Sequence, residues 1–141
     1  MTTITSTLVA IAWLGAANPA DAKPSQADVQ QAEETARAWL GLVDDGRYAE
    51  SWTDAAALFR QSVRMDQWVQ QISTVRAPFG KVLKRQFRSA TPRTSLPGAP
   101  DGEYVVLQYD TDFEHKKAAV ETVTPMRDPD GRWRVSGYFV R

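Results

Sequence analysis

The sequence predicts an α+β fold in which three N-terminal helices pack on a curved, four-stranded antiparallel meander sheet. Two observations support this prediction. Hydrophobic residues recur every three or four positions before Pro78, which is the period of an α-helix. After Gly80 they alternate with polar residues, which is the period of a half-buried strand. Because a lone sheet cannot stay exposed on both faces, we expect the helices to cover one of them.

The first helix is predicted to begin after Ser25 and to end near Gly46. Ser25 is a typical N-cap residue, and Asp28 stands at the third helical position, as in an acidic variant of the capping box. The apolar positions form one stripe, namely Val29, Ala32, Ala36, Trp39, Leu40 and Val43. Gly46 then provides a C-terminal stop signal.

Two more helices are predicted, over residues 48–59 and 65–75. The residues expected to face inward are Tyr48, Trp52, Ala55, Leu58 and Phe59 in the first, and Trp68, Val69, Ile72 and Val75 in the second. The second helix ends before Pro78, because proline disfavours a helical conformation in the residue that precedes it.

Four strands are predicted, within residues 81–89, 103–113 and 118–126 and in the run after Gly131. The loop between the first two, "ATPRTSLPGAPDG", is rich in proline and glycine. The short connection "EHKK" joins the second strand to the third as a hairpin.

The turn before the last strand sets the register of the final hairpin. In "DPDG", residues 128–131, Pro129 fits the second position of a type I turn and Gly131 fits the left-handed bulge position. A loop of this kind is a favoured hairpin connection. The pairs that it predicts are Asp128–Arg132, Pro125–Val135, Val123–Gly137 and Glu121–Phe139. Without the bulge the register shifts by one residue, and Val120, Thr122 and Thr124 face inward instead.

With this register, each strand directs one set of side chains toward the helices. The expected inner face consists of Leu83, Arg85 and Phe87, then Val105, Leu107, Tyr109, Thr111 and Phe113, then Ala119, Glu121 and Val123, and finally Trp133, Val135, Gly137 and Phe139. Arg85, Tyr109 and Glu121 stand out from this otherwise core-like set. Gly137 is expected either to leave space beside the Glu121 carboxylate or to bend the sheet around it.

Glu121 needs partners, because an unpaired buried carboxylate costs several kcal/mol or takes up a proton. We expect it to meet Arg85, the Tyr109 hydroxyl, or an indole N–H of Trp52 or Trp68. This candidate polar pocket has two interpretations, a structural network that fixes the register and a site for ligand binding or acid–base chemistry. An open cavity that reaches Glu121 would indicate a site, whereas a space filled by the two tryptophans would indicate a network.

The composition argues against several other functions. The chain has 141 residues, 17 of them basic and 17 acidic, so it lacks the basic surface that nucleic acid requires. It has no cysteine, and its single histidine, His115, falls at an expected hairpin tip. Neither a typical transition-metal site nor a Ser–His triad is therefore predicted, and no cofactor is predicted.

The N-terminus has the features of a secretory signal peptide. Residues 8–17, "LVAIAWLGAA", form an uncharged apolar run that is too short to span a membrane. Ala20 and Ala22 then flank Asp21 in a small-x-small pattern before Lys23. The stretch "MTTITST" before the run lacks the usual Lys or Arg, and the alternative is a core helix, which Pro19 would interrupt. We expect residues 1–22 to be removed, which leaves one domain, 23–141, exported to the periplasm or secreted.

Three segments carry a resemblance to a known family. They are "GRYAESW", "LPGAPDGEYVVLQYDTDFEHKKAAVETVTPM" and "DGRWRVSGYFV", and the resemblance spans nearly all of the mature chain. They resemble the domain of unknown function 4019 family. The resemblance implies a small, exported bacterial protein with a fold similar to cystatin-like or nuclear transport factor 2-like domains, in which helices and a bent sheet form a cone that can hold a pocket at its mouth. It implies no reaction, because this fold hosts enzymes, binding domains and dimerisation modules alike.

We therefore predict an exported domain that binds a small molecule or a protein partner without catalysis, with no nucleic-acid partner and no membrane span in the mature chain. Two alternatives stay open. In the first, the protein is a cofactor-free enzyme that uses Glu121 as an acid or base. In the second, it is a homodimer whose outer sheet face packs on its twin. The outer-face residues that favour such packing are Tyr104, Val106, Tyr138 and Val140.

Overall fold

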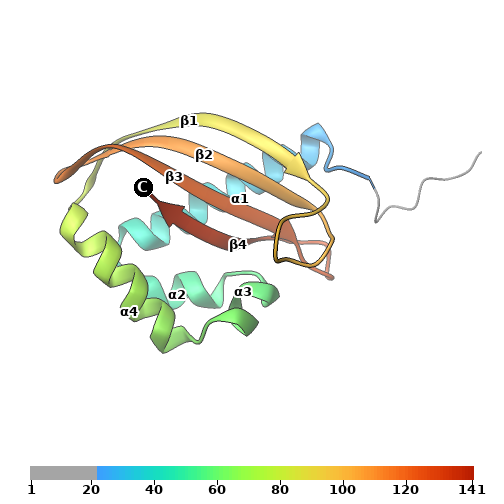
Figure 1. The fold of residues 1–141 in the computed structure, drawn as a ribbon, viewed down its shortest axis with the longest axis horizontal. Helices are drawn as coiled ribbons and strands as arrows, with labels where there is room; N and C mark the ends of the chain where they lie inside the picture. The colour runs from blue at the N-terminus through green and yellow to red at the C-terminus, as the bar shows by residue number, and fades with distance from the viewer. Residues whose placement is uncertain (1–21) are drawn as a thin grey trace, which may run out of the picture.

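The computed structural model describes residues 22–141, and Figure 1 shows their arrangement. The helical elements are α1 (Gln26–Asp44), α2 (Tyr48–Thr53), α3 (Ala57–Ser62), α4 (Met65–Arg76) and a 3₁₀ turn, η2 (Ala77–Phe79). The strands are β1 (Val82–Arg93), β2 (Tyr104–Phe113), β3 (Lys116–Arg127) and β4 (Trp133–Val140). They form one antiparallel sheet in the order β1-β2-β3-β4, so the predicted meander is confirmed. The predicted signal peptide lies outside the described residues, apart from its last position.

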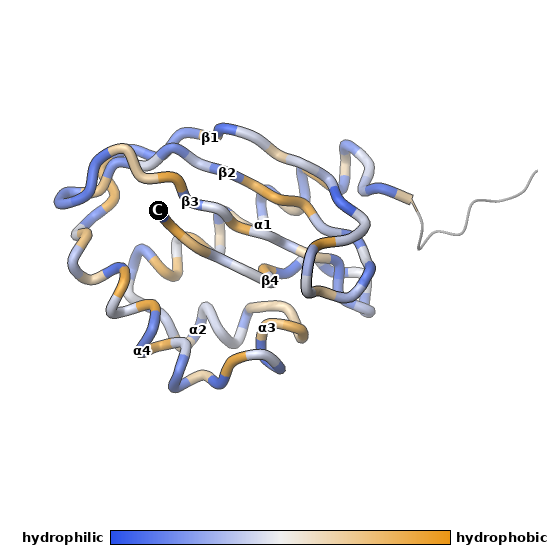
Figure 2. The backbone as a smooth tube through the Cα atoms, viewed as in Figure 1, coloured by the Kyte–Doolittle hydropathy of each residue, from blue (hydrophilic) through white to orange (hydrophobic). Residues whose placement is uncertain are grey.

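The hydrophobic core lies between the sheet and the helices. α1 runs along one face of the curved sheet, while α2, α3 and α4 gather beside β4 (Figure 1). The buried residues of the core come from α1 (Ala32, Ala36, Trp39, Leu40 and Val43), from the later helical region (Ala55, Phe59, Trp68 and Ile72) and from the sheet (Val105, Leu107, Tyr109, Val123, Trp133 and Val135). Figure 2 shows hydrophobic stretches along β2 and at the C-terminal end of β4.

The start of α1 is capped as the sequence predicts. The Ser25 N–H donates to the Asp28 carboxylate at 2.9 Å, and the Asp28 N–H donates to the Ser25 hydroxyl at 3.2 Å. Together these bonds satisfy backbone donors that an uncapped helix would leave free. Gly46 follows the helix with a φ of +73°, a conformation that glycine adopts without strain.

The predicted second helix, 48–59, is wrong, because the chain breaks it into α2 and α3. Ala56 is extended, with a ψ of 152°, and its N–H donates to the Val135 carbonyl of β4 at 2.8 Å. Ala55 and Ala56 are both fully buried at this break. A tertiary hydrogen bond with burial thus outweighs local helical propensity. In α4, the predicted inward residue Val75 is exposed, and Arg76 is buried instead.

The turn at residues 128–131 is confirmed, but the predicted register holds only for the first half of β4. The Asp128 N–H donates to the Arg132 carbonyl at 2.9 Å, and Gly131 has a φ of +84°. Pro125 pairs with Val135 as predicted.

A bulge at Ser136 then shifts the rest of the hairpin by one residue. The pairs beyond the bulge are Thr124–Gly137, Val123–Tyr138, Thr122–Phe139 and Glu121–Val140. Tyr138 consequently turns inward and Phe139 turns outward, with 57% of its surface exposed. The prediction that Gly137 leaves space beside Glu121 is therefore wrong.

Three further placements on the sheet differ from the predictions. Leu83 and Phe87 of β1 are exposed, and bulges interrupt the pairing beside both residues. Tyr104, predicted to lie on an exposed outer face, is buried, and its hydroxyl donates to the Pro100 carbonyl at 2.6 Å. The loop between β1 and β2 thus provides the partner for this tyrosine.

Candidate functional site

Glu121 on β3 is fully buried, on the face of the sheet that the helices cover. Its Oε1 accepts hydrogen bonds from Arg85 Nε at 2.8 Å and from Thr111 Oγ1 at 2.6 Å. Its Oε2 accepts from Arg85 Nη2 at 3.2 Å and from the Tyr138 hydroxyl at 2.5 Å. A carboxylate offers about four acceptor positions, so these donors saturate it.

A second acidic residue, Asp44, extends this cluster at the end of α1. It accepts hydrogen bonds from Arg76 Nη2 and from Arg85 Nη1, each at 2.7 Å. Arg76 also lies 4.0 Å from Glu121 Oε2. We call the set the Glu121 network; its members are Asp44, Arg76, Arg85, Thr111, Glu121 and Tyr138. Two carboxylates and two guanidinium groups balance in charge, which offsets the cost of burying each ion.

Several local features bring these side chains together. Asp44 and Arg76 are the last residues of α1 and α4. A carboxylate at the C-terminal end of a helix is disfavoured by the helix dipole, and α1 has no basic residue in its last turn, so the two arginines supply the compensating charge. The guanidinium of Arg76 also stacks 4.7 Å from the centre of the Phe113 ring.

The pKa values of Asp44 and Tyr138 keep these two members of the network in their hydrogen-bonding forms. Burial would raise the pKa of Asp44, but hydrogen bonds from Arg85 and Arg76 outweigh burial and hold that pKa below its ordinary value. Burial and the neighbouring Glu121 charge both raise the pKa of the Tyr138 phenol. Tyr138 therefore remains a donor to Glu121 at neutral pH.

The lowered pKa of Asp44 predicts an acid-sensitive stability. A carboxyl group whose pKa is lower in the folded state stabilises the fold above its unfolded pKa, here 3.8, and loses this contribution as the pH falls through the folded value. Urea unfolding at pH 6, 4 and 3 should therefore show a smaller loss of stability in Asp44→Asn than in the wild type. Asp101→Asn, which alters an exposed carboxylate, serves as the control. An equal loss in wild type and Asp44→Asn would contradict the prediction.

The structure brings together only two of the five predicted site residues, Arg85 and Glu121. The Tyr109 hydroxyl is buried and has no hydrogen-bond partner among the described residues. Trp52 donates its indole N–H to the Val63 carbonyl at 2.8 Å, and Trp68 donates to Ser51 Oγ at 2.9 Å. Neither tryptophan hydrogen-bonds to Glu121.

Tyr138, Asp44 and Arg76 were not predicted as members of the Glu121 network. A glycine inside a strand often marks a bulge, so "SG" at residues 136–137 was the available signal for Tyr138. Asp44 and Arg76 stand at helix ends, and no periodicity shows which helix ends will meet. Thr111 was placed on the inner face, although not in the polar group.

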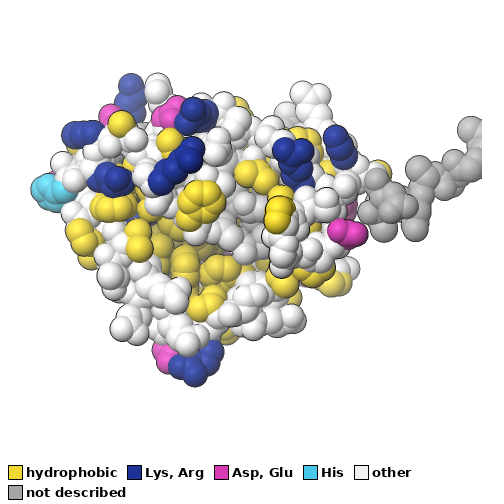
Figure 3. Space-filling model, viewed as in Figure 1, with side chains coloured by type: hydrophobic (Ala, Val, Ile, Leu, Met, Phe, Trp, Pro, Cys, Tyr) yellow, Lys and Arg dark blue, Asp and Glu magenta, His cyan; other side chains and the backbone are white. Residues whose placement is uncertain are grey.

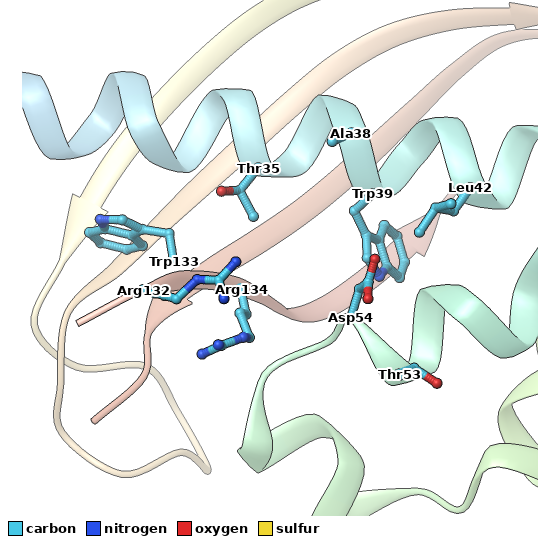
Figure 4. Close-up of a pocket in the computed structure, with 9 residues that line it drawn as sticks. All are labelled: Thr35, Ala38, Trp39, Leu42, Thr53, Asp54, Arg132, Trp133 and Arg134. Atoms are coloured by element: carbon cyan, nitrogen blue, oxygen red, sulfur yellow. The ribbon is translucent and has the colours of Figure 1, made fainter. Parts of the chain in front are cut away.

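A large pocket of the described surface lies away from Glu121. Its volume is about 510 Å³, and it lies between α1, the end of α2 and the start of β4 (Figure 4). We call it the α1–β4 groove; it is lined by Thr35, Ala38, Trp39, Leu42, Thr53, Asp54, Arg132, Trp133 and Arg134. Glu121 lines neither this groove nor the smaller pocket beside Asp44 and Arg76.

The two arginines of the α1–β4 groove differ in their partners. Arg134 donates to Asp128 at 2.8 Å and to Asp130 at 2.8 and 2.9 Å, and its hydrogen bonds lower the pKa of Asp130 to about 2. Arg132 has no ion-pair partner within residues 22–141. Its guanidinium and the Asp54 carboxylate stand on opposite sides of the groove (Figure 4). Of the two arginines in the groove, Arg132 is therefore the one available to a ligand.

The described residues hold no group of three or more side chains suited to binding a metal ion. No helix in the same part of the chain is long and apolar enough to cross a membrane.

Comparison with known proteins adds one finding. The chain matches the model of a family described as "Protein of unknown function (DUF4019)" over residues 35–138. This segment begins within α1 and ends in β4, and it includes every member of the Glu121 network. A search of curated proteins and a search of solved structures each found no match.

Proposed function

The chain belongs to the DUF4019 family, and from that premise we propose that it is an exported domain that binds a small organic acid in the α1–β4 groove and catalyses no reaction. The observation that carries the proposal is that Arg132, which forms no ion pair within residues 22–141, lines a groove of about 510 Å³. Ligand sites in proteins commonly have volumes of about 300–1,000 Å³.

The lining of the groove favours a small ligand that carries a carboxylate. A guanidinium without a partner binds a carboxylate through two parallel hydrogen bonds. Leu42 and the edges of Trp39 and Trp133 offer apolar contact, while the Thr35 hydroxyl can donate or accept. Asp54, on the opposite side, would accept a hydrogen bond from an ammonium or hydroxyl group of the same ligand (Figure 4).

Glu121 argues against the alternative of an acid–base enzyme. A general acid or base must reach the proton that it transfers, directly or through one water molecule. The Glu121 carboxylate is fully buried and already accepts four hydrogen bonds. Its role in our proposal is to hold the sheet and the ends of α1 and α4 together.

Export and the finer fold also belong to this proposal. The apolar run at residues 8–17 and the small residues before Lys23 support a cleaved signal peptide. The curved sheet with α1 along one face supports a cone of the cystatin-like or nuclear transport factor 2-like kind (Figure 1).

A thermal-shift screen tests binding on protein recovered from the periplasm, whose N-terminal residue should be Lys23. Amino acids and small carboxylic acids are the probes. A ligand should raise the melting temperature of the wild type and of Arg93→Gln, an exposed arginine outside the groove, but not of Arg132→Gln. A shift that persists in Arg132→Gln would place the ligand elsewhere. A protein found only in the cytoplasm would refute export, and an N-terminus other than Lys23 would refute the predicted cleavage site.

A further inference from the structure

We propose that residues 136–141, the C-terminal half of β4 with the adjoining Arg141, bind an extended segment of a partner protein, with alternating apolar and polar residues, as a fifth strand of the sheet. The proposal concerns a different surface from the α1–β4 groove, so either can fail without the other.

The backbone of this half-strand is open on one side. β4 is an edge strand, and Val120 and Arg141 exchange both of their backbone hydrogen bonds, at 3.0 and 3.1 Å. Because bonded and non-bonded pairs alternate in an antiparallel ladder, Tyr138 and Val140 direct their N–H and C=O groups away from β3. Within the described residues, no backbone group of another element bonds to them.

The first half of β4 is already covered by the protein itself. The Val135 carbonyl points to the same free edge and accepts the Ala56 N–H at 2.8 Å. The segment between α2 and α3 thus makes one backbone hydrogen bond to β4 at this position, and no such bond reaches Tyr138 or Val140 from within the described residues. A backbone N–H from outside the sheet therefore already bonds to this edge at one point.

The opposite edge of the sheet is protected against pairing. β1 carries Lys84 and Arg88, has Pro92 near its end, and is bulged at two positions. Charges, prolines and bulges are the devices by which natural proteins block edge-to-edge association. The open part of β4 has neither a charge nor a proline before Arg141, and its bulge lies at its first residue, Ser136. Figure 2 shows its end as hydrophobic, where β1 is mainly hydrophilic.

An apolar groove accompanies the open edge. It has a volume of about 200 Å³ and is lined by Trp68, Gln71, Ile72, Val75, Tyr138, Phe139 and Val140. Figure 3 shows hydrophobic side chains in the hollow between β4 and helices α2 and α4. Val75 is 41% exposed on the α4 side. A strand beside β4 would direct every second side chain into this groove.

The size of the surface selects a peptide segment over a second copy of the chain. Stable interfaces use about 20–30 residues from each partner. The open edge has six residues, and α4 adds four to the groove. Strand addition needs less area, because main-chain hydrogen bonds supply affinity and the groove supplies specificity. Arg141, which has no ion-pair partner among the described residues, favours an acidic residue at the adjoining end of the segment.

Selection from a phage-displayed library of random hexapeptides tests the proposal. Enriched peptides should alternate apolar and polar residues, and a synthetic copy should slow amide exchange at Tyr138 and Val140 at least ten-fold. Val140→Pro removes an outward N–H without touching the β3 ladder, and Val75→Lys places a charge in the groove. Each should weaken binding at least ten-fold, whereas Gln70→Lys, on α4 outside the groove, should not.

Three outcomes would overturn the inference. The first is a selection that yields no alternating sequences. The second is a peptide that binds Val75→Lys as tightly as the wild type. This comparison tests the proposal even if Val140→Pro does not fold. The third is a dimer in sedimentation equilibrium that Val75→Lys dissociates, because the occupant of the edge would then be a second copy of the chain.

Discussion

Replacing Glu121 with glutamine is expected to lower the free energy of unfolding by about 3–5 kcal/mol, the usual cost of removing one partner from a buried ion pair. The neutral amide cannot balance Arg85, which donates to Glu121 through both Nε and Nη2. One amide hydrogen would also face a donor from Thr111 or Tyr138, because all four bonds to the carboxylate are donated to it. Urea denaturation at neutral pH measures the loss.

Glu34→Gln provides the matched control for this experiment. Glu34 is an exposed carboxylate on α1, so its change should alter stability by no more than about 0.5 kcal/mol. If Glu121→Gln were as stable as Glu34→Gln, the network would contribute nothing to the fold. Glu121 would then have to be reconsidered as a functional carboxylate.

Two tyrosines on the same face of the sheet should differ in how the loss of their hydroxyl groups changes the stability of the fold. Tyr138→Phe removes a donor to the Glu121 carboxylate and should cost about 1.5–3 kcal/mol, as for other hydrogen bonds to charged groups. Tyr109→Phe removes a buried hydroxyl that has no partner among the described residues. Its stability should be unchanged or higher by up to about 1 kcal/mol.

The two variants control each other, because each deletes one oxygen atom from a buried or half-buried ring. Thermal and urea unfolding of the two variants, measured side by side, test the predicted difference in stability. Equal losses in the two would show that the Tyr138 hydroxyl adds nothing to the network. A larger loss of stability in Tyr109→Phe than in Tyr138→Phe would indicate that the Tyr109 hydroxyl, which alternation places on the inner face, is hydrogen-bonded to a polar group.

Periodicity predicts which face a side chain takes as long as the helix or strand is regular. Alternation along β2 and β3 placed Thr111 and Glu121 on the covered face, and both are buried there. The same alternation failed in β4, because one bulge at Ser136 exchanges the faces of Tyr138 and Phe139. A single irregular residue thus changed which tyrosine reaches Glu121.

Interactions between segments that are far apart in the chain could not be predicted from the sequence. The break between α2 and α3 depends on the hydrogen bond from Ala56 to Val135. These two residues are far apart in the sequence and meet only in the folded protein. Asp44 and Arg76 meet because two helices end at the same corner of the sheet. Local propensity carries no information on either event, since both depend on tertiary contacts.

The span of the Glu121 network along the chain has a kinetic consequence. Three of its bonds join residues 32, 36 and 41 positions apart, and the network connects two helix ends to all four strands. Such a cluster can close only after the meander and both helices are in place, which is late in folding. Interactions that form after the transition state act on the unfolding rate. Stopped-flow measurements on Glu121→Gln should accordingly show faster unfolding and nearly unchanged refolding. The network thus stabilises the domain by lowering its rate of unfolding.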